Sequence, residues 1–199
     1  MSIEIRPLNI AGVMLVTPAK FGDHRGFFSE VYNKQSFAAT GIDIDFVQDN
    51  HSLSAEKGTV RGLHFQTPPL AQHKLVRVAR GAIFDVAVDL RRGSPSYGKH
   101  VSTTLSAEAW NQILVPIGFA HGFMTLEPDT EVIYKVSNYY SPEHERGLLW
   151  NDPDLAIGWP EPAESAIMSD WDRHWPHLKD LPDIFADERK TAHACGAVG

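Results

Sequence analysis

Short runs of β-branched and aromatic residues, separated by turn residues at close intervals, constrain the fold of this chain more than any other feature. The runs predicted as strands are Met14–Thr17, Phe27–Tyr32, Phe46–His51, Leu75–Arg80, Ile83–Leu90, Val101–Leu105, Gln112–Val115, His121–Thr125 and Thr130–Val136. Gly, Pro, Asn and Asp lie between them. This spacing is typical of an antiparallel sandwich or barrel and not of βαβ units. The sequence therefore predicts a mainly β fold.

Helices are expected to be few and short, at Lys34–Ala39 and Pro176–Phe185. The stretch from Ser141 to Glu164 is rich in proline and acidic residues, which favours a wrapping loop over a second domain. At 199 residues the chain is long enough for one well-buried unit. We therefore predict a single domain over residues 1–188 and a disordered tail over residues 189–199.

Charge and cysteine content exclude several classes of function. The net charge is −7 and no run of Lys or Arg is dense enough for a nucleic-acid footprint. The one cysteine, Cys195, rules out a disulfide framework and a multi-cysteine metal site, which favours a reducing compartment. The N-terminal residues contain no long apolar run, so neither a signal peptide nor a membrane span is expected. The predicted location is the cytoplasm.

The segment RGLHFQTPPLAQHK brings four polar side chains together within an otherwise apolar stretch. His64 alternates with Leu63 and Phe65 and would face a barrel interior if those two residues face the other layer. A lone histidine of this kind is more often a satisfied core residue than a functional one. Arg61, Gln72 and Lys74, projecting across a hairpin into the same cavity, favour function, because buried cations left unpaired cost several kcal/mol. A cavity that binds an anion would satisfy them.

For one further histidine and one tyrosine, the sequence alone does not decide between a functional role and a packing role. His121 lies between glycines in FAHGF, which fits either a close approach to a ligand or a tight β-bulge around a buried histidine. Tyr134 shares a face with Val132 and Val136, which is usual for a half-buried packing tyrosine. Only a position opposite His64 would make Tyr134 an acid.

A metal site is the alternative for a small β-barrel with histidines on two hairpins. Such sites usually need a His-x-His pair followed by an acidic ligand. This chain has His64-Phe65-Gln66 instead, with Lys74 where an acidic ligand would be useful. Because an ammonium group repels a divalent cation, we predict that the site holds no metal.

Many motifs in order, from Phe21 to Asp172, resemble the dTDP-4-dehydrorhamnose 3,5-epimerase family. They are FGDHRGFFSEVYN, FVQDNHS, RGLHFQ, AQHKLVRV, GAIFDVAVDLRRGSPSYGKH, LSAE, PIGFAHGFMTL, YYSPEHERGLLWNDPDLAIGWP and SDWD. The resemblance implies a cupin-type jelly-roll barrel that uses no metal and no other cofactor and that forms a homodimer. It also implies epimerisation of dTDP-4-keto-6-deoxyglucose at carbons 3 and 5 to dTDP-4-keto-rhamnose. This is a step of nucleotide-sugar metabolism that supplies either cell-surface polysaccharide or a tailoring pathway.

The resemblance also implies roles for individual residues. His64 falls on the family's catalytic base, Tyr134 on its proton donor and Asp172 on the carboxylate that pairs with the base, while Lys74 is the best candidate to stabilise the enolate. His121 and Asp85 match further pocket positions. The positions expected to hold the nucleotide sugar are Arg25, Glu30, Gln48, Asn50, Arg61, Gln72, His121 and Glu145.

Two departures from the family pattern concern the substrate pocket. Trp171 stands where the family usually has a basic residue that reaches the diphosphate, and His73 stands where a small residue is common. The bulk of His73 beside Lys74 is expected to reshape the pocket. Two alternatives remain: a single-site epimerase acting at carbon 3 or carbon 5, and a non-catalytic nucleotide-sugar binding protein.

Overall fold

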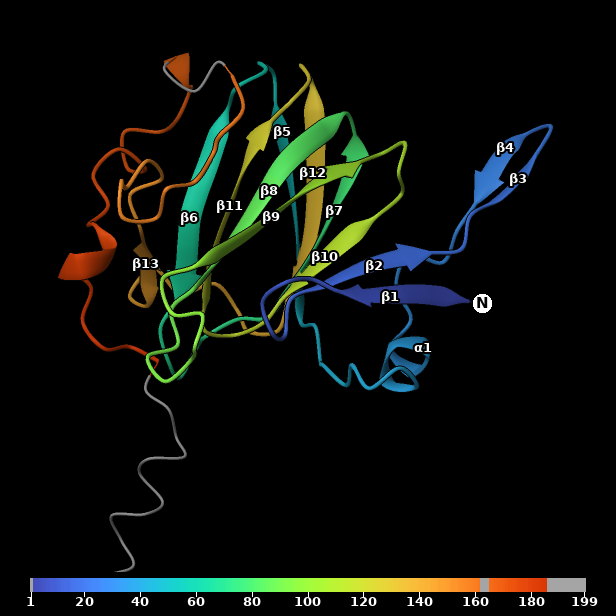
Figure 1. Cartoon of the computed structure of the whole chain (residues 1–199). Helices are drawn as coiled ribbons and strands as arrows, with labels where there is room; N and C mark the ends of the chain where they lie inside the picture. The colour runs from blue at the N-terminus through green and yellow to red at the C-terminus, as the bar shows by residue number, and fades with distance from the viewer. Residues whose placement is uncertain (1, 162–164, 186–199) are drawn as a thin grey trace, which may run out of the picture.

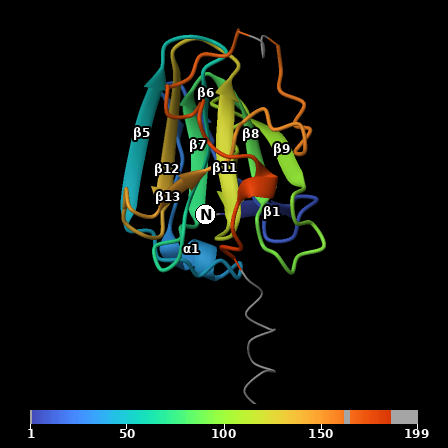
Figure 2. The same ribbon diagram turned by 90° about the vertical axis from the view of Figure 1, so that its left-hand side faces the viewer.

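Two antiparallel sheets form the body of the chain in a computed structural model that describes residues 2–161 and 165–185. One sheet has six strands, in the order β1 (Ile3–Pro7), β2 (Met14–Pro18), β10 (Gln112–Val115), β7 (Lys74–Arg80), β12 (Thr130–Val136) and β5 (Gln48–Ser54). The other has five, in the order β13 (Glu145–Gly147), β6 (Val60–Gln66), β11 (Phe119–Thr125), β8 (Ala82–Asp89) and β9 (His100–Ser106). The two sheets face each other (Figures 1 and 2), which confirms the mainly β prediction.

The space between the sheets is filled by side chains that alternate along the strands. The cluster there includes Val76, Val78, Ile83, Leu105, Ile113, Phe123 and Val132, all of them buried. Alternation with period two sends every second side chain inward. The same period that builds this core therefore also aims polar residues of the same strands toward the interior.

The outer face of each sheet is covered by non-strand chain. Leu63 and Phe65 of β6 pack beneath Leu148, Leu155 and other apolar residues of the C-terminal segment. Burying these two side chains on the outer face leaves His64, between them, facing inward. On the six-stranded sheet, helix α1 (Lys34–Ala38) buries Phe37 against Val16, Leu75 and Leu114.

Helix α1 starts at a strong cap, because the Asn33 side chain accepts hydrogen bonds from the backbone N–H groups of Gln35 and Ser36. The second predicted helical stretch, Pro176–Phe185, is confirmed only in part. Only a 3₁₀ turn, η2 (Leu178–Asp180), forms there, because the backbone on both sides is extended and the N–H of Leu178 bonds to the Asp152 carboxylate at 2.7 Å.

A two-stranded hairpin, β3 (Phe21–Asp23) and β4 (Gly26–Phe28), projects away from both sheets (Figure 1). The predicted strand Phe27–Tyr32 therefore stops early. Its remaining residues serve other contacts: the Ser29 hydroxyl donates to the Ala19 carbonyl, and the Tyr32 ring packs on Phe37 and Phe46. Residues 189–199, predicted as a disordered tail, lie outside the described residues.

Within the described part of the chain, no helix has the length and apolarity that crossing a bilayer would require.

Candidate active site

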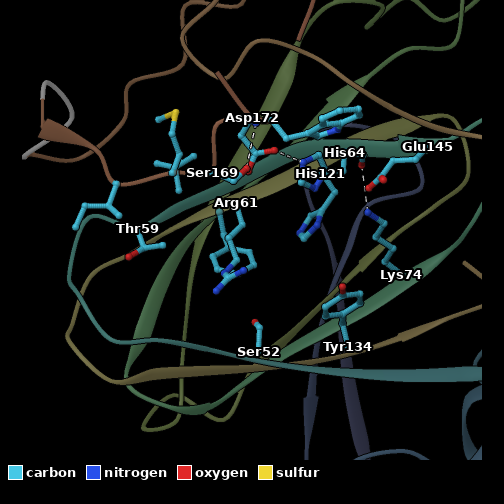
Figure 3. A pocket seen from close by; sticks show the side chains of 15 residues that line it. Ser52, Thr59, Arg61, His64, Lys74, His121, Tyr134, Glu145, Ser169 and Asp172 are labelled. Carbon is cyan, nitrogen blue, oxygen red and sulfur yellow. Dashed lines mark hydrogen bonds and ion pairs between the residues drawn. The ribbon is translucent and has the colours of Figure 1, made fainter. Parts of the chain in front are cut away.

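Side chains from both sheets and from the segment 167–172 line a cavity of about 500 Å³ (Figure 3). Its lining residues are Ser52, Thr59, Val60, Arg61, His64, Lys74, His121, Phe123, Tyr134, Glu145, Ile167, Met168, Ser169, Trp171 and Asp172. The volume suits a small organic molecule. The lining contains both charged or titratable side chains and apolar side chains.

His64 and Asp172 form a short hydrogen bond between residues 108 positions apart in the sequence. The Nε2 atom of His64 lies 2.5 Å from Oδ1 of Asp172, and the carboxylate side chain is only 7% exposed. The segment that carries Asp172 is held to β6 by backbone bonds, from Val60 N to Ile167 O at 2.7 Å and from Ile167 N to Gly58 O at 3.0 Å. A strand thus fixes the imidazole and an adjacent loop delivers its carboxylate.

The pair has a defined protonation pattern. Burial opposes ionisation of Asp172, yet the hydrogen bond from His64 and smaller contributions from Trp175 and Ser169 hold its pKa below the usual value. An ionised carboxylate accepts the proton of Nε2–H, which leaves Nδ1 of the neutral imidazole as the basic nitrogen. His64 is therefore equipped to accept a proton from a bound molecule.

Lys74 places a buried ammonium group beside the dyad. Its Nζ atom donates to the backbone carbonyl of His64 at 3.1 Å (Figure 3). Burial lowers the pKa of Lys74 to about 8, while the negative charges of Asp85 and Glu145 oppose that decrease. A partly desolvated cation of this kind interacts strongly with an oxyanion that forms nearby.

A second His–Asp pair lies next to the first. His121 on β11 is directly opposite His64 on β6 in the strand register, so both side chains point to the same face. The Nε2 atom of His121 lies 2.8 Å from Oδ2 of Asp85, which is fully buried on β8. The open question about His121 is thereby answered structurally: it lines the cavity and is also a satisfied, buried histidine.

Tyr134 faces His64 from the opposite sheet. β12, which carries Tyr134, belongs to the six-stranded sheet, and β6 belongs to the five-stranded one. Figure 3 shows the phenol and the imidazole on opposite sides of the cavity. Burial raises the pKa of Tyr134 above its ordinary value, with Arg61 opposing, so the hydroxyl keeps its proton at neutral pH.

The structure brings together seven of the residues predicted for the site, and it corrects how they meet. His64, Tyr134, Asp172, Lys74, Arg61, His121 and Glu145 all line the cavity. β6 and β7 do not form a hairpin, because they lie in different sheets. Arg61 and Lys74 therefore approach the cavity from opposite walls, across the interior.

The other predicted binding residues do not line the cavity. Gln48 donates to Asn50 at 2.9 Å and accepts from the backbone N–H of Tyr140 at 3.0 Å, while Gln72 donates to the Asn138 carbonyl at 2.7 Å. These three amides thus fix the chain beside the cavity. Arg25 lies on the projecting hairpin and pairs with Asp23 at 2.6 Å, and Glu30 follows that hairpin.

His73 does not reshape the cavity as expected. It lies outside the lining, and its Nδ1 atom accepts a hydrogen bond from the backbone N–H of Ile117 at 3.4 Å. Burial lowers the pKa of His73, which favours its neutral form. Its imidazole is therefore a neutral group that lies outside the cavity.

Sequence reasoning missed the apolar wall of Ile167 and Met168 and the indole of Trp175, which bonds to Asp172 at 3.3 Å. An isolated β-bridge between Thr59 and Ile167 holds that wall in place. Because only one residue of the segment is paired in this way, its sequence shows no periodic pattern that would predict the contact. Trp171 lines the cavity and is 67% exposed. In residues 2–161 and 165–185 we find no group of three or more His, Cys, Asp or Glu side chains that could hold a metal ion.

A base held by a carboxylate, a phenol on the opposite wall and a buried ammonium group between them define an enzyme that moves protons next to a carbonyl group. An enzyme of this kind is an isomerase that inverts carbon centres. The chain belongs to the dTDP-4-dehydrorhamnose 3,5-epimerase family, whose model matches residues 7–180.

Relatives support this assignment over most of their length. The chain is 56% identical over 178 residues to a dTDP-4-dehydrorhamnose 3,5-epimerase of Sinorhizobium fredii, covering 89% of this chain and 91% of the relative. A Bacillus anthracis dTDP-4-dehydrorhamnose 3,5-epimerase, crystallised with TDP and pyrophosphate, is 52% identical with a TM-score of 0.86, covering 88% of this chain and 99% of that one. A Legionella pneumophila dTDP-6-deoxy-D-glucose-3,5-epimerase in complex with dTDP-4-keto-L-rhamnose is 41% identical with a TM-score of 0.87, covering 91% and 95%.

These structural similarities confirm the predicted cupin-type jelly roll. A single-site enzyme also occurs among the relatives: a dTDP-4-dehydrorhamnose 3-epimerase of Streptomyces niveus is 41% identical over 159 residues, covering 79% of this chain and 76% of the relative. The relatives with higher identity bear the name of the double epimerase.

Proposed function

We propose that this chain converts dTDP-4-keto-6-deoxyglucose to dTDP-4-keto-rhamnose by inverting carbons 3 and 5. The observation that carries the proposal is the placement of His64 and Tyr134 on opposing sheets across one cavity. Inversion requires that a proton leave one face of a ring carbon and return to the other. A base on one wall and an acid on the other meet that requirement.

The proposed steps balance without an oxidant or a reductant. Nδ1 of His64 takes the proton from carbon 3 or carbon 5, and the bonding electrons move toward the keto oxygen on carbon 4, giving an enolate. The Lys74 ammonium group stabilises that oxygen. The Tyr134 hydroxyl then donates its proton to the carbon from the opposite face, and solvent exchange restores both side chains.

The imidazolium formed in the first step stays paired with Asp172. An adjacent carboxylate holds the imidazole in one tautomer and orientation and stabilises its protonated form. Because Asp172 is 7% exposed, water screens this interaction little. His64 can therefore act as a base at both carbons without leaving its position.

Arg61 is the cation in the cavity suited to the diphosphate. Its Nε atom donates to the Ser54 hydroxyl and its Nη2 atom to the Leu53 carbonyl, each at 3.1 Å, so the guanidinium is held at the cavity wall with donors to spare. A planar guanidinium gives bidentate contacts to phosphate oxygens. This contact matters more here because Trp171 carries no charge.

The test of the proposed function is solvent exchange. Incubating the protein with dTDP-4-keto-6-deoxyglucose in heavy water should place deuterium at carbons 3 and 5, with both centres inverted in the product seen by NMR. Exchange and inversion at one carbon would instead show a single-site epimerase. Binding without exchange would show a protein that only holds the nucleotide sugar.

We also propose a homodimer in which the partner's β3–β4 hairpin completes the nucleotide site. Phe21, Phe27 and Phe28 are 52%, 55% and 64% exposed on this short hairpin, and exposed apolar side chains that gather on one element mark an interaction surface. Arg25 lies at its tip. Docking the rings on a second copy would bury them and bring the partner's Arg25 and Glu30 to a cavity that they do not reach within one chain.

The dimer predicts linked changes in assembly and substrate affinity. Sedimentation at micromolar concentration should show a dimer, and the variant with Phe27→Ser and Phe28→Ser should shift toward monomer with a raised KM. Leu53→Ser, which removes a 55% exposed side chain on β5 instead, is the matched control and should change neither. A wild-type monomer with full activity would contradict this proposal.

We propose that the reaction takes place in the cytoplasm, because a chain with a single cysteine fits a reducing compartment.

A further inference from the structure

Trp175 contacts the dyad without lining the cavity. It lies three residues after Asp172, and its Nε1–H donates to Oδ1 of that carboxylate at 3.3 Å. The same oxygen is the one that bonds to Nε2 of His64 at 2.5 Å. One carboxylate oxygen is therefore held between the imidazole of the base and an indole.

The indole itself has little freedom to move. Its ring lies edge-on to the His64 ring, with centroids 6.0 Å apart, and edge-on to the Trp171 ring at 5.6 Å. Gly147, which is opposite His64 in the strand register, leaves the space for it: a Cβ atom there would come within 2.4–2.6 Å of the Trp175 ring. The strand next to the base thus provides a slot in which the indole fits.

We propose that Trp175 is a positioning residue that acts on His64 through Asp172. The inference rests on the proposed function, in which His64 is the base. Asp172 is carried by a loop segment and not by a strand, so its carboxylate needs a further contact to keep one orientation. An indole N–H on a fixed ring supplies that contact, and a small misplacement of a catalytic group slows a reaction severely.

The decisive experiment is a double-mutant cycle with Trp175→Phe and Asp172→Asn. Phenylalanine keeps an aromatic ring in the slot and removes the N–H. We expect Trp175→Phe to lower kcat roughly tenfold, which is about 1.4 kcal/mol, with KM unchanged because Trp175 is not part of the cavity lining. In the Asp172→Asn background, the same substitution should change kcat little, because the ionised acceptor is gone.

Trp159→Phe is the matched control. Trp159 also donates its Nε1–H, to the Trp150 carbonyl at 2.8 Å, and also packs on aromatic rings, but away from this cavity. The Trp159→Phe variant, which loses this N–H group, should keep the wild-type kcat. An unchanged kcat in Trp175→Phe, or an equal decrease in both backgrounds, would overturn the positioning role. Either result would leave exchange by the wild-type protein, and so the proposed function, intact.

Discussion

Replacing His64 with asparagine is expected to lower both solvent exchange and product formation by roughly 10²–10⁴-fold, the usual contribution of a general base. Asparagine keeps a polar group near the position of Nδ1, the nitrogen that faces the substrate, but it has no basic nitrogen and does not reach Asp172 as Nε2 does. Without the base, neither carbon 3 nor carbon 5 loses its proton, so exchange and inversion should decrease together. Heavy-water NMR with the 4-keto sugar measures both in one sample.

Two variants make this result specific. His51→Asn changes a histidine on β5 that faces away from the cavity and pairs with Glu131 at 3.0 Å, so it should keep full activity. Tyr134→Phe leaves the base in place and removes the acid on the opposite wall, so exchange should persist while inversion falls. An active His64→Asn variant would contradict the assignment of the base.

The alternation of side chains explains how much of this site the sequence predicts. Leu63 and Phe65 identify the outward face of β6, so the inward direction of His64 follows from its neighbours and is confirmed. The same reasoning places Tyr134 on the face of Val132 and Val136, which the structure shows. What local sequence could not give was the sheet to which each strand belongs.

The features of the site that the sequence did not predict depend on contacts between segments far apart in the chain. The supposed hairpin of Arg61 and Lys74 is wrong because strand pairing is decided by partners far along the chain: β6 pairs with β11 and β13, and β7 pairs with β10 and β12. The resemblance, and not periodicity, indicated Asp172. The sequence did not indicate Trp175, because the space for its ring is provided by Gly147, which lies 28 positions earlier.

Arg25 and Glu30, at and just after the hairpin, show a different limit of prediction from the sequence. A motif match assigns Arg25 and Glu30 to the nucleotide sugar, yet neither residue lines the cavity of its own chain. Arg25 lies on the projecting hairpin (Figure 1), and Glu30 follows the hairpin. Sequence similarity reports that a residue belongs to a site, and it does not report which copy of the chain supplies it. The exposed aromatic rings of the hairpin are the physical reason for the proposal that a second copy of the chain receives Arg25 and Glu30.

Removing the charge of Lys74 is expected to have the second-largest effect. Lys74→Gln keeps a hydrogen-bond donor and loses the cation that stabilises the enolate, so kcat should fall by about 10²–10³-fold, as when an oxyanion contact is lost. KM should change less, because the charge on the keto oxygen appears only during the reaction. Lys135→Gln, which removes a lysine paired with Asp49 on the other face of β12, is the matched control.

The pH dependence of kcat/KM tests the same residue independently. With burial lowering its pKa to about 8, Lys74 is mostly protonated at pH 7 and loses its charge as the pH rises past 8. The ammonium group is the form that stabilises an oxyanion, so kcat/KM of the free enzyme should decrease above about pH 8. In Lys74→Gln that decrease should disappear from the remaining activity. A variant that keeps it would show that another group titrates there and that Lys74 does not carry the charge the enolate needs.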